Sequence, residues 1–334
     1  MNRFFLLAMA LLTAVTSCKT KTDQSENKTE TTAVVQAPAF TADSAYQFIA
    51  RQVAFGPRVP NTTAHVQGGD YLVAKLKEFG CTVTEQKFTA TTWDGKKLNA
   101  RNIIGSINPQ ASKRILLASH WDSRPQSDQD SSAVNAKKAV PAANDGASGV
   151  GVLLELARTV QQAKQKPTVG IDLVFFDAED WGNSDKAQGD KEGEVDYVGF
   201  CLGSRYFAKN PFKPGYTPYY GVLLDMVGAK GATFMKEGYS REMAAGVVSK
   251  VWETASKAGF SQFFLDQNGG AITDDHLPVN TLMKAPMIDI IHTTPPAGGF
   301  FPQWHTSTDD MSQIDSATLK AVGQTLLQVL YNEQ

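Results

Sequence analysis

Four short polar stretches of this chain hold the residues best suited to chemistry. They are Asn-Asp-Gly at residues 144–146, Asp-Ala-Glu-Asp at 177–180, Asp-Asp-His at 274–276 and Trp-His-Thr at 304–306. Carboxylates and histidines are ligands of catalytic zinc, which needs three such N/O ligands, a separate acid/base group and one open coordination position. The tryptophan before the histidine also indicates a tight apolar pocket beside the metal.

Each acidic position also has an ordinary structural explanation. Asp145 could cap the apolar helix that follows it, although Ser148 could fill that place. The pair at 274–275 could cap a helix as well. Glu179 and Asp180 could be solvated loop acids, but two adjacent carboxylates both stay ionised readily only around a positive charge. Metal binding by one and proton transfer by the other would satisfy that condition.

The histidines carry a similar ambiguity. His305 is one of only five histidines, and a lone histidine is more often structural than a ligand. The aromatic and proline residues at 300–304 indicate an ordered loop and favour the ligand role. His120 and Asp225 each end an apolar run, where they could bind a second metal or orient the ligands of the first. Only the ordered combination of these signals is strong.

The apolar pattern predicts the elements that must position these residues. Continuous apolar runs predict strands buried on both faces, at residues 114–120, 170–176, 220–226 and 286–291. Helices are expected at 43–54, 63–79, 148–162, 204–209, 241–258 and 316–331, and an antiparallel pair at 83–91 and 98–107. This alternation predicts an α/β fold, a three-layer sandwich with a central mixed, mostly parallel sheet flanked by helices. Ligands in such sheets lie beyond the C-terminal strand ends, so the candidate residues should converge at one edge.

The composition fits a soluble globular protein with one large domain. The chain has 334 residues, of which 42% are hydrophobic and 20% are charged. Its net charge is −2, from 32 Lys and Arg against 34 Asp and Glu, and no long basic run follows the extreme N-terminus. These features argue against nucleic acid or an anionic membrane surface as a partner.

The first residues predict a targeting segment. Residues 1–17 contain one arginine and an apolar run too short to span a bilayer comfortably, and small residues precede Cys18. This pattern resembles a bacterial lipoprotein signal peptide, in which Cys18 becomes the lipidated N-terminus; an ordinary secretory peptide is the alternative. Residues 18–39 predict a flexible tether, and residues 40–334 a single catalytic domain. The protein would be exported and lipid-anchored in the bacterial cell envelope, facing the periplasm or in the outer membrane, with no other membrane contact.

Two further cysteines, Cys81 and Cys201, lie far apart in the sequence. An exported protein could pair them. Nothing local places them within bonding distance, so two free, mostly buried thiols are expected. They also lack the spacing of a metal site.

Taken in order, the polar residues resemble the motifs of a zinc exopeptidase-type fold over residues 40–334. The matching positions are His120-x-Asp122, Asn144-Asp145-x-x-Ser148-Gly149, Phe176-Asp177-x-Glu179-Asp180, Asp225 and His305. Two branches share this fold: the di-zinc aminopeptidases and the glutaminyl-peptide cyclotransferases, also called glutaminyl cyclases.

Several motifs resemble the cyclase branch more closely. Asp-Asp-His-Leu-Pro at residues 274–278 is the most specific, because it closely resembles the cyclase Asp-Asp-His-x-Pro motif. Residues 301–306 with the acidic pair at 309–310 resemble a second cyclase stretch, and residues 223–229 resemble a third. Aminopeptidases of this fold more often have a tyrosine before the final histidine, to hydrogen-bond a tetrahedral intermediate. Trp304 cannot do this in the same way.

The resemblance implies a bacterial glutaminyl cyclase of the animal type, a zinc-dependent acyltransferase. One Zn²⁺ per chain would be held by Asp145, Asp180 and His305. The substrates would be peptides or proteins with an N-terminal glutamine, whose α-amine attacks its own γ-amide carbonyl. Glu179 would take the amine proton and give it to the departing ammonia, leaving a pyroglutamyl peptide.

The resemblance also implies supporting roles. Asp225 and Asp274 would assist the proton transfer and stabilise the charged amine. Asp289, which is counted among the substrate-binding residues, stands where animal cyclases place a histidine, and it would share a proton with Asp274. The segment after Asp180 is polar and differs from that of the animal enzymes. Three aromatic side chains would enclose the substrate and exclude bulk water: Trp304, Phe301 and Trp181.

Two other functions are consistent with parts of the pattern. In aminopeptidase hydrolysis, His120 and Asp225 would bind a second zinc, which Asp145 would bridge to the first. Glu179 would then activate water. A catalytically silent surface lipoprotein that only binds peptides would show damaged site positions, and none of the proposed positions is damaged.

Overall fold

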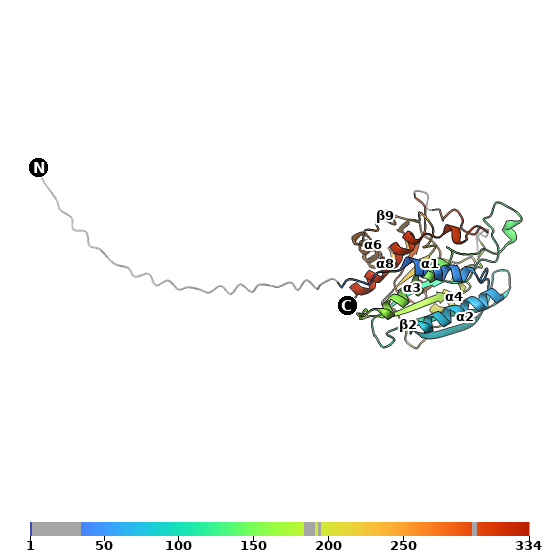
Figure 1. Ribbon diagram of the computed structural model, residues 1–334, viewed down its shortest axis with the longest axis horizontal. Helices are drawn as coiled ribbons and strands as arrows, with labels where there is room; N and C mark the ends of the chain where they lie inside the picture. The colour runs from blue at the N-terminus through green and yellow to red at the C-terminus, as the bar shows by residue number, and fades with distance from the viewer. Residues whose placement is uncertain (2–34, 184–190, 193–194, 296–298, 334) are drawn as a thin grey trace. The chain divides into compact units, whose positions relative to one another are not determined.

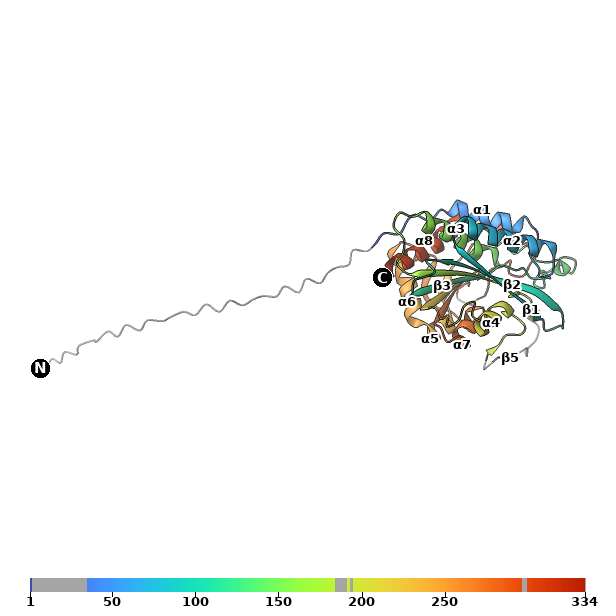
Figure 2. The same ribbon diagram turned by 90° about the horizontal axis from the view of Figure 1, so that it is seen from below.

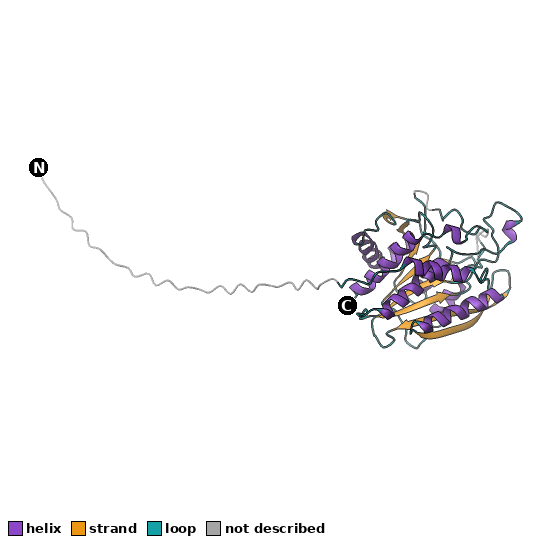
Figure 3. Cartoon of the chain, in the orientation of Figure 1, coloured by secondary structure: helices purple, strands orange, loops and turns teal. Residues whose placement is uncertain are grey.

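A six-stranded sheet lies at the centre of the computed structural model, which describes residues 1, 35–183, 191–192, 195–295 and 299–333 (Figures 1 and 3). Its strand order is β1 (Thr82–Thr91), β2 (Lys97–Ile107), β4 (Gly170–Phe176), β3 (Arg114–His120), β7 (Tyr220–Asp225) and β10 (Met287–Ile291). Strands β4, β3, β7 and β10 run parallel. The β1–β2 hairpin joins β4 in antiparallel fashion. The sheet is therefore mixed and mostly parallel, as predicted.

Helices cover both faces of this sheet and complete three layers (Figure 2). One face carries α1 (Ala42–Val53), α2 (Thr63–Glu78), α3 (Ala147–Gln162) and α8 (Ser316–Asn332). The other carries α4 (Leu202–Lys209), α5 (Gly238–Met243) and α7 (His276–Thr281). Helix α6 (Ala245–Lys257) packs beside α8. The predicted three-layer α/β architecture is confirmed.

Strand β3 illustrates why the apolar runs become central strands. Its side chains alternate between two cores: Ile115 and Leu117 join the core under α1, α3 and α8, whereas Leu116 and Ala118 join the core under α4 and α7. All seven residues of β3 are buried. A strand covered on both faces needs apolar residues at every position, and this produces a continuous run in place of alternation.

Smaller elements complete the fold, and one helix prediction is wrong. The short strands are β5 (Lys191–Glu192), β6 (Val195–Asp196), β8 (Phe234–Lys236) and β9 (Phe264–Asn268), and the 3-10 turns are η1 (Asn135–Lys137) and η2 (Met311–Gln313). The single helix expected over residues 241–258 is two helices, α5 and α6. The helical conformation is interrupted between them at Ala244, where φ is −145° and ψ is 38°. Helix α5 begins earlier than predicted because Glu237 caps it.

The start of the described chain is packed against α8. The Gln328 side chain accepts from the N–H of Ala37 and donates to the carbonyl of Val35, and Gln324 accepts from the N–H of Phe40. Residues 35–39 of the predicted tether are thus held on the domain. The rest of that tether and Cys18 lie outside the described residues, as does the predicted signal peptide beyond Met1.

Two further observations concern the described part of the chain. None of its helices has the length and apolar character that crossing a membrane requires. Cys81 and Cys201 are both free and buried, as predicted. No disulfide therefore contributes to the stability of the described domain.

Candidate active site

Three predicted metal ligands converge beyond the strand ends. Asp145 lies two residues before the start of α3, Asp180 follows β4, and His305 lies in the loop between β10 and η2. One ligand atom of each lies within 4.8 Å of the others, and all three residues are buried. His305 Nε2 is 3.2 Å from Asp180 Oδ1 and 3.8 Å from Asp145 Oδ2. The structure thus brings together the three residues that the sequence assigned to zinc.

This set of donor atoms fits a zinc ion. Two carboxylates and one imidazole with a further open position are typical of catalytic zinc sites. Among the described residues, Asp180 Oδ2 has no hydrogen-bond partner although it is buried, and a buried carboxylate oxygen is costly unless a cation accompanies it. Burial lowers the pKa of His305, but the charge of Asp180 and hydrogen bonds with Asp128 and Asp180 raise it to about 9. A metal ion would therefore displace a proton from this imidazole.

A buried arginine and its partner hold these ligands from behind. Asp128 Oδ1 lies 3.4 Å from His305 Nδ1, which turns Nε2 toward the two carboxylates. Arg124 donates to Asp128 Oδ2 over 2.6 Å and to Asp180 Oδ1 over 3.1 Å. Sequence reasoning missed Arg124 and Asp128, because neither stands in a motif or at the end of an apolar run.

Two more aspartates fix the backbone of the ligand turns. Asp309 accepts from the N–H groups of residues 144–145 over 2.9 and 3.1 Å. Asp122 accepts from the N–H groups of residues 179–180 over 3.1 and 3.2 Å. Both aspartates belong to the motifs quoted above, where only their position in the pattern pointed to them. Their role in holding the turns comes from the structure alone.

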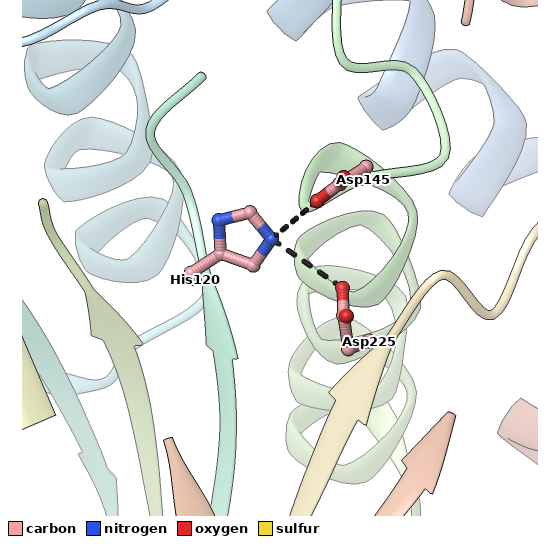
Figure 4. Close-up of side chains that lie close together, drawn as sticks. All are labelled: His120, Asp145 and Asp225. Carbon is pink, nitrogen blue, oxygen red and sulfur yellow. Dashed lines mark ion pairs between the residues drawn. The ribbon is translucent and has the colours of Figure 1, made fainter. Parts of the chain in front are cut away.

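A second buried cluster shares one of the ligands (Figure 4). His120 Nε2 lies 2.9 Å from Asp145 Oδ1 and 3.4 Å from Asp225 Oδ1, and Figure 4 shows all three side chains pointing toward one another. Burial lowers the pKa of His120, but hydrogen bonds with its carboxylate neighbours raise it well above the ordinary value. A Cβ at Gly146 would lie 2.5 Å from the His120 carbonyl oxygen, so only glycine lets the start of α3 approach β3 this closely.

Carboxyl groups with raised pKa values stand next to the ligands. Cys201 Sγ donates a weak hydrogen bond to Glu179 Oε1 over 3.5 Å, and Asp274 lies within 4.8 Å of both. Burial raises the pKa of Glu179 well above the ordinary value; the charge of His120 opposes this rise, and the charges of Asp180, Asp275 and Asp274 add to it. Burial and the charge of Asp225 raise the pKa of Asp274 to about 7. Carboxyls that hold a proton near neutral pH are suited to acid/base chemistry.

Asp289 lies behind Asp274 and is fully buried. Burial and the negative charge of Asp274 raise the pKa of Asp289 well above its usual value. Two neighbouring buried carboxyls cannot both ionise readily, which supports the prediction that this pair shares a proton. Asp289 was predicted to be a substrate-binding residue, but it does not line the cavity beside the candidate ligands, so it can act on a substrate only through Asp274.

A cavity of about 420 Å³ opens onto the candidate metal ligands and the carboxyl groups beside them. Glu179, Asp225 and Asp274 lie in its lining together with the three candidate ligands, and its apolar walls include Phe200, Ile272, Phe300 and Trp304. The ring centroid of Trp304 lies 3.7 Å from that of His305 and 4.7 Å from that of Phe300. Trp304 therefore borders both the cavity and a candidate ligand, as its place in the sequence predicts.

Two other predicted wall residues lie elsewhere. Phe301 is 2% exposed and packs below the cavity with Met226 and Ile291, and its neighbour Phe300 lines the cavity in its place. Trp181 lines a different hollow, where Lys96 Nζ lies 5.0 Å from its ring centroid. The prediction that these two side chains face the cavity is wrong. Loop residues have no regular hydrophobic period, so the sequence does not show which way a loop side chain points.

The fold and the site define a zinc exopeptidase-type enzyme. Residues 102–330 match the family model described as Peptidase family M28, and the chain belongs to this family. Within it, the chain is similar to a glutaminyl cyclase of Bacteroides thetaiotaomicron whose crystal structure contains N-acetylhistamine. The two are 50% identical with a TM-score of 0.85, over 90% of this chain and 100% of that one. The predicted resemblance to bacterial glutaminyl cyclases is confirmed.

The chain is also similar to two further proteins. A structure of a leucine aminopeptidase precursor from Bacteroides thetaiotaomicron VPI-5482 is also 50% identical, with a TM-score of 0.84 over 90% of this chain and 100% of that one. The glutaminyl-peptide cyclotransferase of Drosophila melanogaster is 27% identical over 288 residues, which are 78% of this chain and 73% of that protein. The individual roles of the site residues stay predictions.

Proposed function

We propose that this protein is a glutaminyl-peptide cyclotransferase, which converts the N-terminal glutamine of peptides or proteins into pyroglutamate and ammonia. One observation carries the proposal: a small cavity holds the buried, protonatable Glu179 and Asp274 beside a three-ligand metal set, with Trp304 in its wall. The similarity to glutaminyl cyclases supports the same activity.

The proposed reaction needs one proton to move between two nitrogens of the substrate. The α-amine forms a C–N bond to the γ-amide carbon, and the bond from that carbon to the amide nitrogen breaks. Glu179 takes the proton that the attacking amine loses and gives it to the departing nitrogen, which leaves as ammonia. A raised pKa suits this role because the carboxyl must be able to hold the proton between the two steps.

The other cavity residues bind and orient. Asp225 and Asp274 face the cavity and would hold the substrate amine close to its own side chain, and Asp289 would keep one proton on the Asp274 pair. Trp304 and Phe300 would enclose the folded-back glutaminyl side chain and exclude the water that would otherwise hydrolyse it. Asp145, Asp180 and His305 would hold one zinc ion, which when bound polarises the γ-amide carbonyl.

Aminopeptidase hydrolysis is the second candidate. The His120–Asp145–Asp225 cluster has the ligand types for a second metal. One similar structure, which is 50% identical to this chain, is that of a leucine aminopeptidase precursor. We place it second because the cyclase motifs at residues 274–278 and 301–306 and the tryptophan at 304 are present in the chain.

One incubation separates the two candidates. The purified, zinc-loaded protein is mixed with a peptide that begins with glutamine, and ammonia and free glutamine are both measured. Cyclisation releases ammonia without free glutamine, and mass spectrometry should show that the peptide has lost the mass of one ammonia from its N-terminal residue. Free glutamine without ammonia would assign the protein to the aminopeptidases. A peptide with N-terminal asparagine serves as the control, because its side chain is one carbon shorter.

A further inference from the structure

Behind the cavity wall formed by residues 271–274 lies a buried carboxylate that the proposed reaction does not use. Glu237 is 1% exposed and directly precedes α5. Its Oε1 accepts from the N–H of Tyr239 over 2.8 Å, and its Oε2 accepts from the N–H and the hydroxyl of Ser240 over 2.6 and 2.7 Å. This much is ordinary capping of a helix N-terminus.

The same carboxylate also holds the cavity wall. Glu237 Oε1 accepts a further hydrogen bond from the N–H of Ile272 over 2.9 Å, and Ile272 lines the cavity. The N–H of Gly238 donates to the carbonyl of Gly270 over 2.8 Å. A Cβ at Gly238 would lie 2.7 Å from the backbone of Ala271, so the two segments are in direct backbone contact. Residues 270–272 are therefore tied to the start of α5.

A buried histidine connects Glu237 to the acid pair. His276 is fully buried at the start of α7, and its Nε2 lies 3.3 Å from Glu237 Oε2 while its Nδ1 lies 4.0 Å from Asp289 Oδ2. Ser240 makes a second link, because its Oγ accepts from the N–H of Asp289 over 2.9 Å. Glu237 thus reaches both Asp289, which lies behind Asp274, and the wall at Ile272.

Glu237 is held in its ionised form. Burial raises the pKa of its carboxyl, but the hydrogen bond and charge of His276 and the hydrogen bonds of Ser240 outweigh it and lower the pKa to about 2. A charged acceptor makes stronger hydrogen bonds than a neutral one. One carboxylate therefore organises donors from three segments: the start of α5, the cavity wall and the start of α7.

We infer that Glu237 and His276 form a positioning pair, which fixes the cavity wall at residues 271–274 and the Asp274–Asp289 pair in the geometry that substrate binding requires. Neither residue lines the cavity. The inference rests on the proposed function, because it assigns the wall to substrate binding.

The test is Glu237→Gln in the zinc-loaded protein. A glutamine of the same length turns an NH₂ group toward either the Tyr239 and Ile272 donors or the Ser240 and His276 donors, so one of these links is lost. We expect KM for a glutamine-initiated peptide to rise about tenfold, the effect of losing a hydrogen bond to a charged group. We also expect faster amide hydrogen exchange over residues 269–274, with zinc content unchanged.

The matched control is Glu242→Gln, which changes an exposed glutamate of the same helix. It should leave both KM and the exchange of residues 269–274 unchanged. An effect on folding alone would lower the amount of active protein without moving KM. A folded, zinc-loaded Glu237→Gln protein with normal KM and normal exchange would overturn the inference.

Two further measurements keep the test decisive. If Glu237→Gln does not fold, His276→Asn removes the same link from the other side and should raise KM and exchange in the same way. Where both variants fold, the double variant should be no worse than the more impaired single one, because the two residues act as a unit. Absence of ammonia release by the unmodified protein would refute the proposed function, whereas the exchange measurement would still test the positioning pair.

Discussion

Asp145 is the residue that joins the two buried clusters. Its Oδ1 lies 2.9 Å from His120 Nε2, and its Oδ2 lies 3.8 Å from His305 Nε2. Burial raises the pKa of Asp145, but the hydrogen bond and charge of His120 and the charge of His305 lower it below the ordinary value. This environment favours the ionised carboxylate, whose two oxygens face the two clusters separately.

Glu179 should be separable from metal binding by mutation. Glu179→Gln keeps the size of the side chain but cannot take the amine proton, so we expect turnover to fall by about 10²–10⁴-fold, the usual contribution of a general base. Zinc content, measured by atomic absorption, should stay that of the unmodified protein. Glu78→Gln, a change of an exposed glutamate on α2, is the matched control and should retain full turnover. Full activity in Glu179→Gln would rule out the proposed shuttle.

Asp274 should impose a pH dependence on stability. Its pKa is raised from 3.8 to about 7, so the folded state binds the proton more tightly than the unfolded chain does. The stabilisation is fully present below pH 3.8 and is lost as the pH rises through 7. The free energy of unfolding of the metal-free protein therefore decreases as the pH rises, and Asp274 accounts for part of that decrease. Asp274→Asn should make the decrease smaller by on the order of 2–4 kcal/mol, since one pKa unit corresponds to about 1.4 kcal/mol.

Urea unfolding at about pH 4.5 and about pH 8, on either side of most of this titration, would measure the effect. The loss of stability between the two pH values should be smaller for Asp274→Asn than for the unmodified protein. Asp43→Asn, an exposed change on α1, should leave the loss unaltered. An equal loss in all three proteins would contradict the raised pKa.

At the scale of elements, the turn at residues 144–146 before α3 is a joint, because it connects the start of α3 to the segment that follows β7. The side-chain oxygen of Asn144 accepts from the N–H of Gly228 over 2.8 Å, and Ser148 Oγ accepts from the N–H of Val227 over 3.0 Å. These contacts tie the start of α3 to the segment that follows β7. Asp145 lies in the first of these segments and Asp225 ends β7 directly before the second, so the joint sets the distance between them.

Removing the amide at this joint should weaken the site without touching a ligand. Asn144→Ala leaves the N–H of Gly228 buried without its partner, which costs about 1–3 kcal/mol of unfolding free energy. We expect a zinc affinity about 10–100-fold lower, as for other residues that support metal ligands. Chelator competition measures the affinity, and Asn99→Ala on the exposed side of β2 is the control. An unchanged zinc affinity in a destabilised Asn144→Ala protein would show that the joint does not support the metal site.

The sequence predicted elements better than side-chain directions. The continuous apolar run at β3 correctly predicts a buried strand, because a strand that is covered on both faces needs apolar residues at every position. Helix α5 was hidden within a longer apolar pattern, because its boundary depends on Glu237 and on partners near Ile272 that lie far away in sequence. Phe300 and Phe301 show the limit most clearly. Two adjacent aromatic residues in a loop differ in role, and only tertiary packing decides which one reaches the cavity.

At the scale of the whole molecule, attachment to the envelope remains a proposal that rests on the first residues of the chain. We expect Cys18→Ser to move the protein from the membrane fraction of its cells to the soluble fraction, because the lipid would have no attachment point. Cys81→Ser changes a buried thiol of the domain and should not release it. Soluble unmodified protein would exclude the lipid anchor and favour an ordinary secretory peptide.

The hydrogen bond from the Asp145 N–H to Asp309 joins residues 164 positions apart. We expect a contact over such a distance to form late, since a long loop must close before it yields any stabilisation. Because His305 comes from the same distant part of the chain, a partly synthesised chain lacks the third ligand and cannot hold zinc in this set. Zinc uptake by the proposed ligand set would therefore report that the chain has folded as far as residue 305, and the proposed cyclisation could begin only then.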